Sequence, residues 1–343
     1  MGIILAVILF SFIVVFHELG HFLMARLNGI EVEEFALGMG PLLFSKEYKG
    51  TRYCVRAFPI GGACMMGEDD EATGEEGNFH SKPVWARIMV IAGGPVFNFI
   101  LAFVLAAVLT AMVGYDPAVI GAVSEESPAE KSGLMAGDEI VEMGNKKIHI
   151  FREISAYNQF HQGETVEVAY ERNGKRHRAV ITPEYNEELE YYMLGIGSEG
   201  NQKAGVLTSL QYGVYEVKYW IWVAASGLKM LLTGQVGLDQ MSGPVGIVDM
   251  VDDAYNSSVD YGISIVAANM MNMAILLSAN LGVMNLLPIP ALDGGRLVFL
   301  FAEAVRRKRV SPEKEGYVHF IGFALLMALM VFAFYNDIRR LFL

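Results

Sequence analysis

Residues 3 to 27 read IILAVILFSFIVVFHELGHFLMARL, an apolar run that contains the motif H-E-x-x-H. Positions i and i+4 lie on one face of a helix, so the imidazoles of His17 and His21 can reach a single metal ion. Glu18, beside the first histidine, can then address a water on that metal. The plainer interpretation is a pair of buried histidines that bond to neighbouring carbonyl groups. The rest of the chain has to distinguish the two.

The bulk composition is that of a membrane protein. The 343 residues are 53% hydrophobic and only 19% charged, and the mean hydropathy is positive. The formal net charge of -12 and the lack of a long basic stretch argue against a nucleic-acid partner. Cys54 and Cys64 are too few for a disulfide framework, and their spacing matches no zinc knuckle.

Four apolar segments are long enough to cross a hydrocarbon core, which needs about 20 residues. They are about Ile3 to Leu27, Val84 to Val113, Ile263 to Leu287 and Val318 to Tyr335. A fifth stretch, residues 212–232, mixes Trp and Tyr with charged residues, which favours an amphipathic helix at the membrane interface.

Basic residues set the expected orientation, because short cytoplasmic loops carry an excess of Lys and Arg. Such residues gather between the first two spans and between the last two, so both loops are predicted to be cytoplasmic. The termini and the long middle segment are then extracytoplasmic. The basic residues are Arg26, Lys46, Lys49, Arg52, Arg56, Lys82 and Arg87, and Arg296, Arg306, Arg307, Lys308, Arg309 and Lys314.

The middle segment, about residues 116–199, has a soluble composition. Asn173-Gly174 between two strand-like runs predicts a hairpin with a type I′ turn. Residues 127–140 look like the loop, short helix and strand of a PDZ domain, which predicts one inserted PDZ-like α+β module. An unrelated extracellular β-domain is the plain alternative.

Residues 42–66 alternate like strands although they lie close to the predicted membrane face. Open strand edges cannot face lipid, so a hairpin here has to lie against protein or line a wet cavity.

A catalytic zinc site takes three protein ligands, and the sequence offers one outstanding candidate for the third. Asp293 follows Pro288 and Pro290 in NLLPIPALDGG (285–295), where two prolines exclude a regular helix. A carboxylate therefore arrives where the chain is unwound, although an interfacial turn residue is the alternative. Four other histidines lie in soluble loops and one begins the last span without a partnering motif; they are His80, His149, His161, His177 and His319.

The order of these motifs resembles the site-2 protease family of intramembrane zinc metalloproteases. The resemblance includes the H-E-x-x-H segment, Gly93-Gly94-Pro95-Val96-Phe97-Asn98, the PDZ-like insert and residues 285–294. It is closest to the bacterial type that cleaves anti-sigma factors or leftover signal peptides. One departure is that the best-known enterobacterial members carry two tandem PDZ domains, whereas this chain has room for one.

The resemblance implies roles for particular residues. His17, His21 and Asp293 would bind Zn²⁺, Glu18 would be the general base, and Asn285 would help to hold the substrate backbone. Residues 42–66 would form a membrane-reentrant β-hairpin, with Gly38-Met39-Gly40-Pro41 as the turn that leads into it.

We therefore expect a polytopic α-helical membrane protein with about four transmembrane helices, a membrane-reentrant β-hairpin and an inserted extracytoplasmic PDZ-like α+β domain. The expected parts are a first membrane half (1–114), the PDZ-like domain (115–199), an amphipathic or interfacial linker (200–262) and a second membrane half (263–343).

The expected activity is zinc-dependent intramembrane proteolysis in a bacterial cell membrane, with the active site near the cytoplasmic side. Expected partners are membrane lipid and single-pass membrane proteins, either a pre-cleaved anti-sigma factor or a signal peptide remnant. One alternative is a membrane PDZ scaffold or chaperone with a structural or vestigial metal site, which requires a fourth protein ligand. A zinc transporter is another, but it requires further carboxylates or histidines along the other spans, and those carry almost none.

Overall fold

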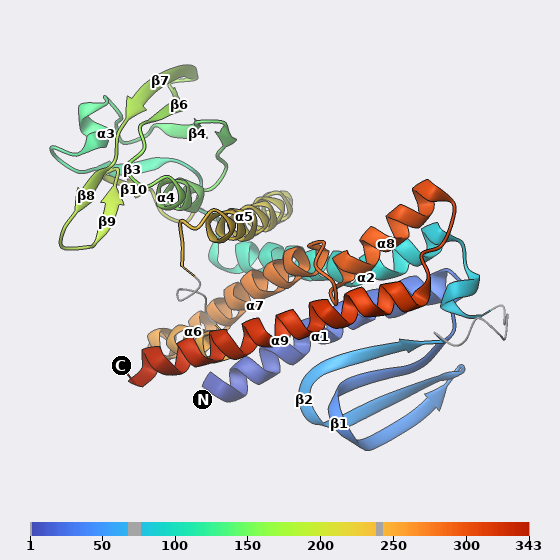
Figure 1. Cartoon of the computed structure of the whole chain (residues 1–343). Helices are drawn as coiled ribbons and strands as arrows, with labels where there is room; N and C mark the ends of the chain where they lie inside the picture. The colour runs from blue at the N-terminus through green and yellow to red at the C-terminus, as the bar shows by residue number, and fades with distance from the viewer. Residues whose placement is uncertain (1, 68–76, 238–242, 343) are drawn as a thin grey trace. The chain divides into compact units, whose positions relative to one another are not determined.

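The computed structural model describes residues 2–67, 77–237 and 243–342. Four of its helices are long and apolar enough to cross a membrane: α1 (Gly2–Leu27), α2 (Val84–Val113), α7 (Ile263–Leu286) and α9 (Pro312–Phe342) (Figure 1). The four predicted spans are therefore present. The chain divides into two compact units, residues 1–102 with 231–343, and residues 103–230.

In the first unit, α1 and α2 approach closely through glycines. A Cβ added to Gly93 would lie 2.7 Å from the backbone oxygen of Gly20, and one added to Gly20 would collide with the backbone oxygen of Gly93. Small residues at such a crossing let two helix backbones come together. This contact places the histidine-bearing helix directly against α2.

A helix that the sequence did not predict, α6 (Pro244–Val259), packs against α1, α7 and α9. Its start is held by Asp337 on α9, whose carboxylate accepts hydrogen bonds from the N–H groups of Gly243, Val245 and Gly246 at 2.9, 3.0 and 3.0 Å. A carboxylate at a helix N-terminus satisfies unpaired N–H groups and the helix dipole. The expected linker 200–262 thus holds α5 (Val206–Leu232) in one unit and α6 in the other.

The predicted hairpin is part of a larger sheet formed by β1 (Val32–Tyr48) and β2 (Thr51–Met66). The register pairs residues 42–48 with 51–56 and residues 32–37 with 62–66, and it also sets 34–37 beside 52–55 with both segments running the same way. Gly38, Gly40 and Gly61 have φ values of +82°, +84° and +85°, which let the long strands change direction. Residues 62–66 form one edge of this sheet.

A short connection and a polar clamp complete the first unit. The chain passes through a 3₁₀ turn, Phe79–Ser81, into α2, and α8 (Asp293–Arg306) follows α7. Arg87 on α2 donates to both carboxylate oxygens of Glu303 on α8, at 3.1 and 2.5 Å, and its side chain is buried. This bidentate pair fixes α8, and with it the segment that begins with Asp293, against α2.

The second unit contains the predicted soluble module. One sheet has the order β5 (Lys146–Lys147), β4 (Glu139–Met143), β6 (Val166–Arg172), β7 (Lys175–Ile181), and β3 (Ile120–Val123) pairs with β10 (Ile196–Ser198). Helices α3 (Pro128–Lys131) and α4 (Phe151–Phe160) and the pair β8 (Glu184–Asn186) and β9 (Tyr191–Met193) complete it. Positive φ values at Asn173 and Gly174 confirm the predicted turn.

Helix α5 also belongs to this second unit. Glu216 on α5 pairs with Arg152 on α4 at 3.1 Å, and Lys146 lies over the ring of Trp222 at 4.2 Å. Among the described helices, α5 is not one of those apolar enough to span a membrane.

Candidate metal centre

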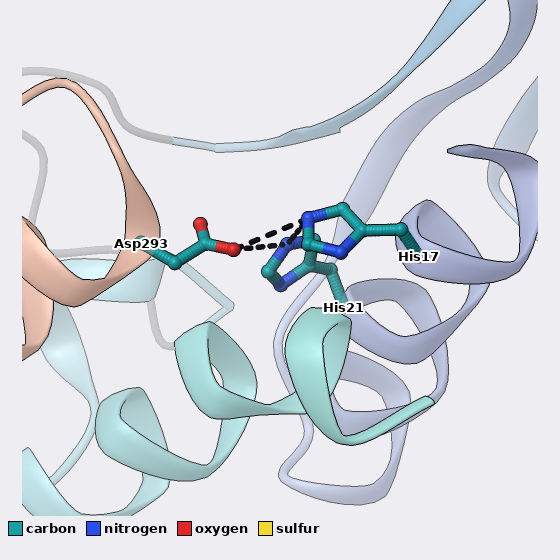
Figure 2. A group of neighbouring side chains, drawn as sticks. All are labelled: His17, His21 and Asp293. Carbon is teal, nitrogen blue, oxygen red and sulfur yellow. Dashed lines mark hydrogen bonds and ion pairs between the residues drawn. The ribbon is translucent and has the colours of Figure 1, made fainter. Parts of the chain in front are cut away.

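The two histidines of the motif lie one turn apart on α1 and point the same way. Both side chains are buried, and their Nε2 atoms are 3.2 Å apart (Figure 2). The helical spacing alone produces this pair, as the sequence predicts.

Asp293 reaches the pair from the first position of α8, directly after a segment that cannot be helical. Helix α7 ends at Leu286, and the chain runs through two prolines before α8 begins at Asp293. Ala291 has a left-handed φ of +77°, and its N–H donates to Nδ1 of His319 on α9 at 2.8 Å. The connection is so tight that a Cβ on Gly294 would collide with the backbone oxygen of Leu287. This loop holds the carboxylate in place.

The three donor atoms form a triangle of the size that zinc requires. Oδ2 of Asp293 lies 3.2 Å from Nε2 of His17 and 3.5 Å from Nε2 of His21. Ligands about 2.0–2.1 Å from a tetrahedral zinc are about 3.3 Å from one another, so all three sides of the triangle fit. Figure 2 shows the carboxylate pointing between the two imidazoles.

The same oxygen has an unmet need for a partner. Oδ2 of Asp293 is buried, and within the described residues it has no hydrogen bond beyond its contacts with the two imidazoles. A buried carboxylate oxygen without a donor is costly, and a cation supplies the missing partner. Among the described residues, no further His, Cys, Asp or Glu belongs to this group, so the cluster has the three such ligands of a catalytic zinc site and not the four of a structural one.

Helix α2 supports the far sides of both rings. Nδ1 of His21 donates to the backbone oxygen of Val90 at 2.9 Å, and Nδ1 of His17 lies 3.1 Å from Nδ2 of Asn98. A Cβ on Gly94 would lie 2.6 Å from Cε1 of His17 and would collide with Nε2 of His21. Only glycine therefore fits beneath the cluster. Residues 93–98 are part of the resemblance to site-2 proteases, but the sequence predicted no role for Asn98.

Glu18 lies beside the ligand cluster but is not part of it. A Cβ on Gly62 would be 3.0 Å from Cγ of Glu18 and 3.8 Å from Cγ1 of Val14, so the sheet edge 62–66 passes close to this carboxylate. Cys64 lies on the same edge as a free thiol, but it does not belong to the ligand cluster.

Asn285 lies in the last turn of α7 and is half-buried. Of the other histidines, His319 supports the Asp293 loop, His80 lies in the 3₁₀ turn, and three lie in the second unit, outside the cluster; these are His149, His161 and His177. The structure therefore brings His17, His21 and Asp293 together and leaves the rest apart.

Four long apolar helices and a two-histidine, one-aspartate triangle define a membrane protein of the metallopeptidase class. A model of peptidase family M50 matches residues 5–329, and the chain belongs to this family. The resemblance to site-2 proteases and the prediction of a peptidase are thereby confirmed.

Relatives cover nearly the whole chain. Zinc metalloprotease RasP of Bacillus licheniformis is 34% identical, with 99% of each chain covered. The regulator of sigma-W protease RasP of Bacillus subtilis is 33% identical, again with 99% of each chain covered. That alignment runs over 425 positions, so the Bacillus subtilis protein contains residues that this 343-residue chain lacks. The names agree with the predicted zinc cofactor.

A protein of Clostridium acetobutylicum is 37% identical over 338 residues, with 98% of this chain and 97% of that protein covered. Among solved structures, the PDZ domain of the SdrC-like protein from Listeria monocytogenes is 27% identical and covers 25% of this chain and 90% of its own, with a TM-score of 0.22. This score is too low to establish a shared fold.

Proposed function

We propose that this chain is a zinc-dependent endopeptidase that cleaves transmembrane segments of single-pass membrane proteins, such as anti-sigma factors or remnant signal peptides. The proposal rests on the triangle of His17, His21 and Asp293, which has zinc dimensions and no fourth His, Cys, Asp or Glu among the described residues. Its two histidines lie on a helix apolar enough to span a membrane. A structural metal site would instead be closed by a fourth protein ligand.

Each residue has a defined part in the proposed reaction. His17, His21 and Asp293 hold the zinc, which when bound supplies a Lewis acid that polarises a carbonyl and makes water a nucleophile. Glu18 accepts the proton of the attacking water and delivers it to the leaving amine. Glu18 directly follows His17 on α1 and is not one of the three ligands, which leaves its carboxylate available for this role.

The sheet edge supplies a way to hold the substrate. A helical substrate hides its carbonyl groups in intrahelical bonds, so the segment to be cleaved has to become extended first. Among the described residues, 62–66 pair only with 32–37, and Gly62 lies beside Glu18, so an extended peptide can add a strand at this edge. In this proposal Asn285 helps to hold the substrate main chain.

The proposed setting is a bacterial cell membrane. The basic residues flanking the spans favour extracytoplasmic termini and an active site near the cytoplasmic face. Residues 42–66 would then form the membrane-reentrant hairpin, with its open edge against protein or a wet cavity, and residues 115–199 the extracytoplasmic PDZ-like module. Such a module would exclude substrates with bulky ectodomains or bind a newly formed C-terminus.

Glu18→Gln is the variant that tests the activity. In detergent-purified full-length protein it is expected to lower cleavage of a model single-pass helix by about 10²- to 10⁴-fold while the zinc content stays unchanged. His17→Ala is the matched variant that loses zinc as well as activity. If the Gln variant cleaves at the wild-type rate, Glu18 is not the base.

A further inference from the structure

Asn98 on α2 is fully buried, and its carboxamide faces the metal ligand His17 from behind. Its Nδ2 atom lies 3.1 Å from Nδ1 of His17, while its Oδ1 atom is buried and has no hydrogen-bond partner among the described residues. We propose that Asn98 is a positioning residue that holds His17 in the tautomer that binds zinc. This inference rests on the proposed ligand set.

The chemistry of the imidazole decides what the partner of Nδ1 must be. Nε2 of His17 faces Asp293 at 3.2 Å and is therefore the nitrogen on the metal side. A neutral imidazole that binds a metal through Nε2 carries its proton on Nδ1, so that nitrogen has to donate a hydrogen bond. An amide nitrogen cannot accept it, but the oxygen of the same carboxamide can.

A half-turn of the carboxamide exchanges the two roles without moving any other atom. With Oδ1 towards the ring, Asn98 accepts from Nδ1–H and favours the zinc-binding tautomer. With Nδ2 towards the ring, Nδ1 is an acceptor and the proton sits on Nε2, where it blocks the metal. Which orientation is present follows from hydrogen-bond chemistry, because the two atoms have nearly the same shape. The zinc-binding tautomer of His17 therefore requires Oδ1 of Asn98 to face the ring.

The two zinc-binding histidines differ in this respect. Nδ1 of His21 faces the backbone oxygen of Val90, which only accepts, so His21 always carries its proton on Nδ1. His17 depends on a side chain instead. The backbone of Asn98 is itself held, because the buried hydroxyl of Ser278 on α7 donates to its carbonyl oxygen at 2.8 Å. A substitution can therefore remove the Nδ1 partner of His17, whereas the Nδ1 partner of His21 is a backbone oxygen that every residue carries.

Zinc affinity of the full-length protein, measured by competition with a chelator, tests the inference. Asn98→Leu keeps the branching at Cγ but removes the acceptor, and the affinity is expected to fall about 10- to 100-fold. Asn98→Asp keeps an acceptor towards Nδ1–H and is expected to bind zinc within a fewfold of the wild type. Ser278→Ala, which removes only the bond to the main chain of Asn98, is the control and is expected to change the affinity far less than Asn98→Leu.

If Asn98 had a purely structural role, the order of zinc affinities would differ. Asn98→Asp would then bind zinc no better than Asn98→Leu, because a buried carboxylate disturbs packing at least as much as leucine does. Zinc affinity of Asn98→Leu equal to the wild type, or of Asn98→Asp reduced tenfold or more, overturns the inference. If Asn98→Leu does not fold, the Asp variant alone decides. His17→Ala separates the two levels: retained zinc in that variant overturns the ligand set, whereas lost zinc with an unaffected Asn98→Leu overturns only the role of Asn98.

Discussion

Two aspartates, one in each unit, show how differently a carboxylate can be placed. Asp138 is 1% exposed and fully partnered: Arg172 donates to both of its oxygens at 2.6 and 2.7 Å, and the N–H of Met135 donates at 2.8 Å. Asp293 has one buried oxygen that faces two imidazoles and has no hydrogen-bond partner among the described residues. Burial alone therefore does not mark a site, whereas an unmet hydrogen-bonding need does.

Asp293→Ala is expected to give the largest effect, loss of bound zinc and of all cleavage. Removing one of three ligands leaves two imidazoles, which hold zinc too weakly to survive purification. Because the oxygen that is lost had no other partner, we expect the metal-free variant to unfold at nearly the wild-type temperature. Zinc content by elemental analysis and thermal unfolding of the metal-free protein provide the measurements, and undiminished zinc would remove Asp293 from the ligand set.

Asp138→Ala is expected to do the reverse. It removes the carboxylate partner of Arg172, which keeps only its bond to the backbone oxygen of Gly133 among the described residues, and is expected to destabilise the second unit by about 3 kcal/mol, with zinc content unchanged. Chemical denaturation, monitored by hydrogen exchange of the backbone amides in residues 103–230, measures this loss of stability. A variant that loses zinc with its stability intact would contradict the distinction between the two aspartates.

The same pair predicts a pH dependence. Burial tends to raise the pKa of Asp138, but the Arg172 guanidinium and the Met135 N–H outweigh it and lower that pKa below its ordinary value. A carboxyl whose pKa is lower in the folded state contributes its full stabilisation of the fold at pH values above its unfolded pKa of about 3.9. It loses that contribution as the pH falls through its folded pKa. The stability of residues 103–230 should therefore fall with acid below about pH 4.

Asp138→Asn is the matched control for this acid dependence, and its stability curve should be flatter in the same range. An identical pH profile in the Asn variant would show that other carboxyl groups are responsible.

Ala291→Gly is expected to give the smallest effect. A left-handed φ of +77° strains alanine but not glycine, although glycine also makes the unfolded chain more flexible. We expect unfolding stability to change by less than about 1 kcal/mol and zinc affinity to stay within a fewfold. A large loss of zinc would show that the loop before Asp293 needs stiffness as well as the right shape.

The sequence predicted the metal ligands of the site but not the residues that hold these ligands in place. The i, i+4 spacing fixed His17 and His21 on one face, and the prolines before Asp293 indicated an unwound loop. The contact from Asn98 joins residues 81 positions apart, and a single Asn in an apolar helix carries no sign of its partner.

Two parts of the fold also lay beyond the sequence pattern. Helix α6 carries Asp252, Asp253 and several polar residues, so its composition does not resemble a span, yet packing against α1, α7 and α9 stabilises it. Residues 32–37, with two glutamates, gave no strand signal next to a membrane. They form a strand because they pair on both sides, with residues 52–55 and 62–66. Both partners come from later in the chain, so the local pattern does not reveal them.

The most direct test of the central claim is zinc X-ray absorption spectroscopy on the purified full-length protein. We expect two imidazoles and only oxygen donors besides them, at about 2.0–2.2 Å from the zinc, with no sulfur at about 2.3 Å. A third imidazole or a thiolate in the zinc spectrum would contradict it.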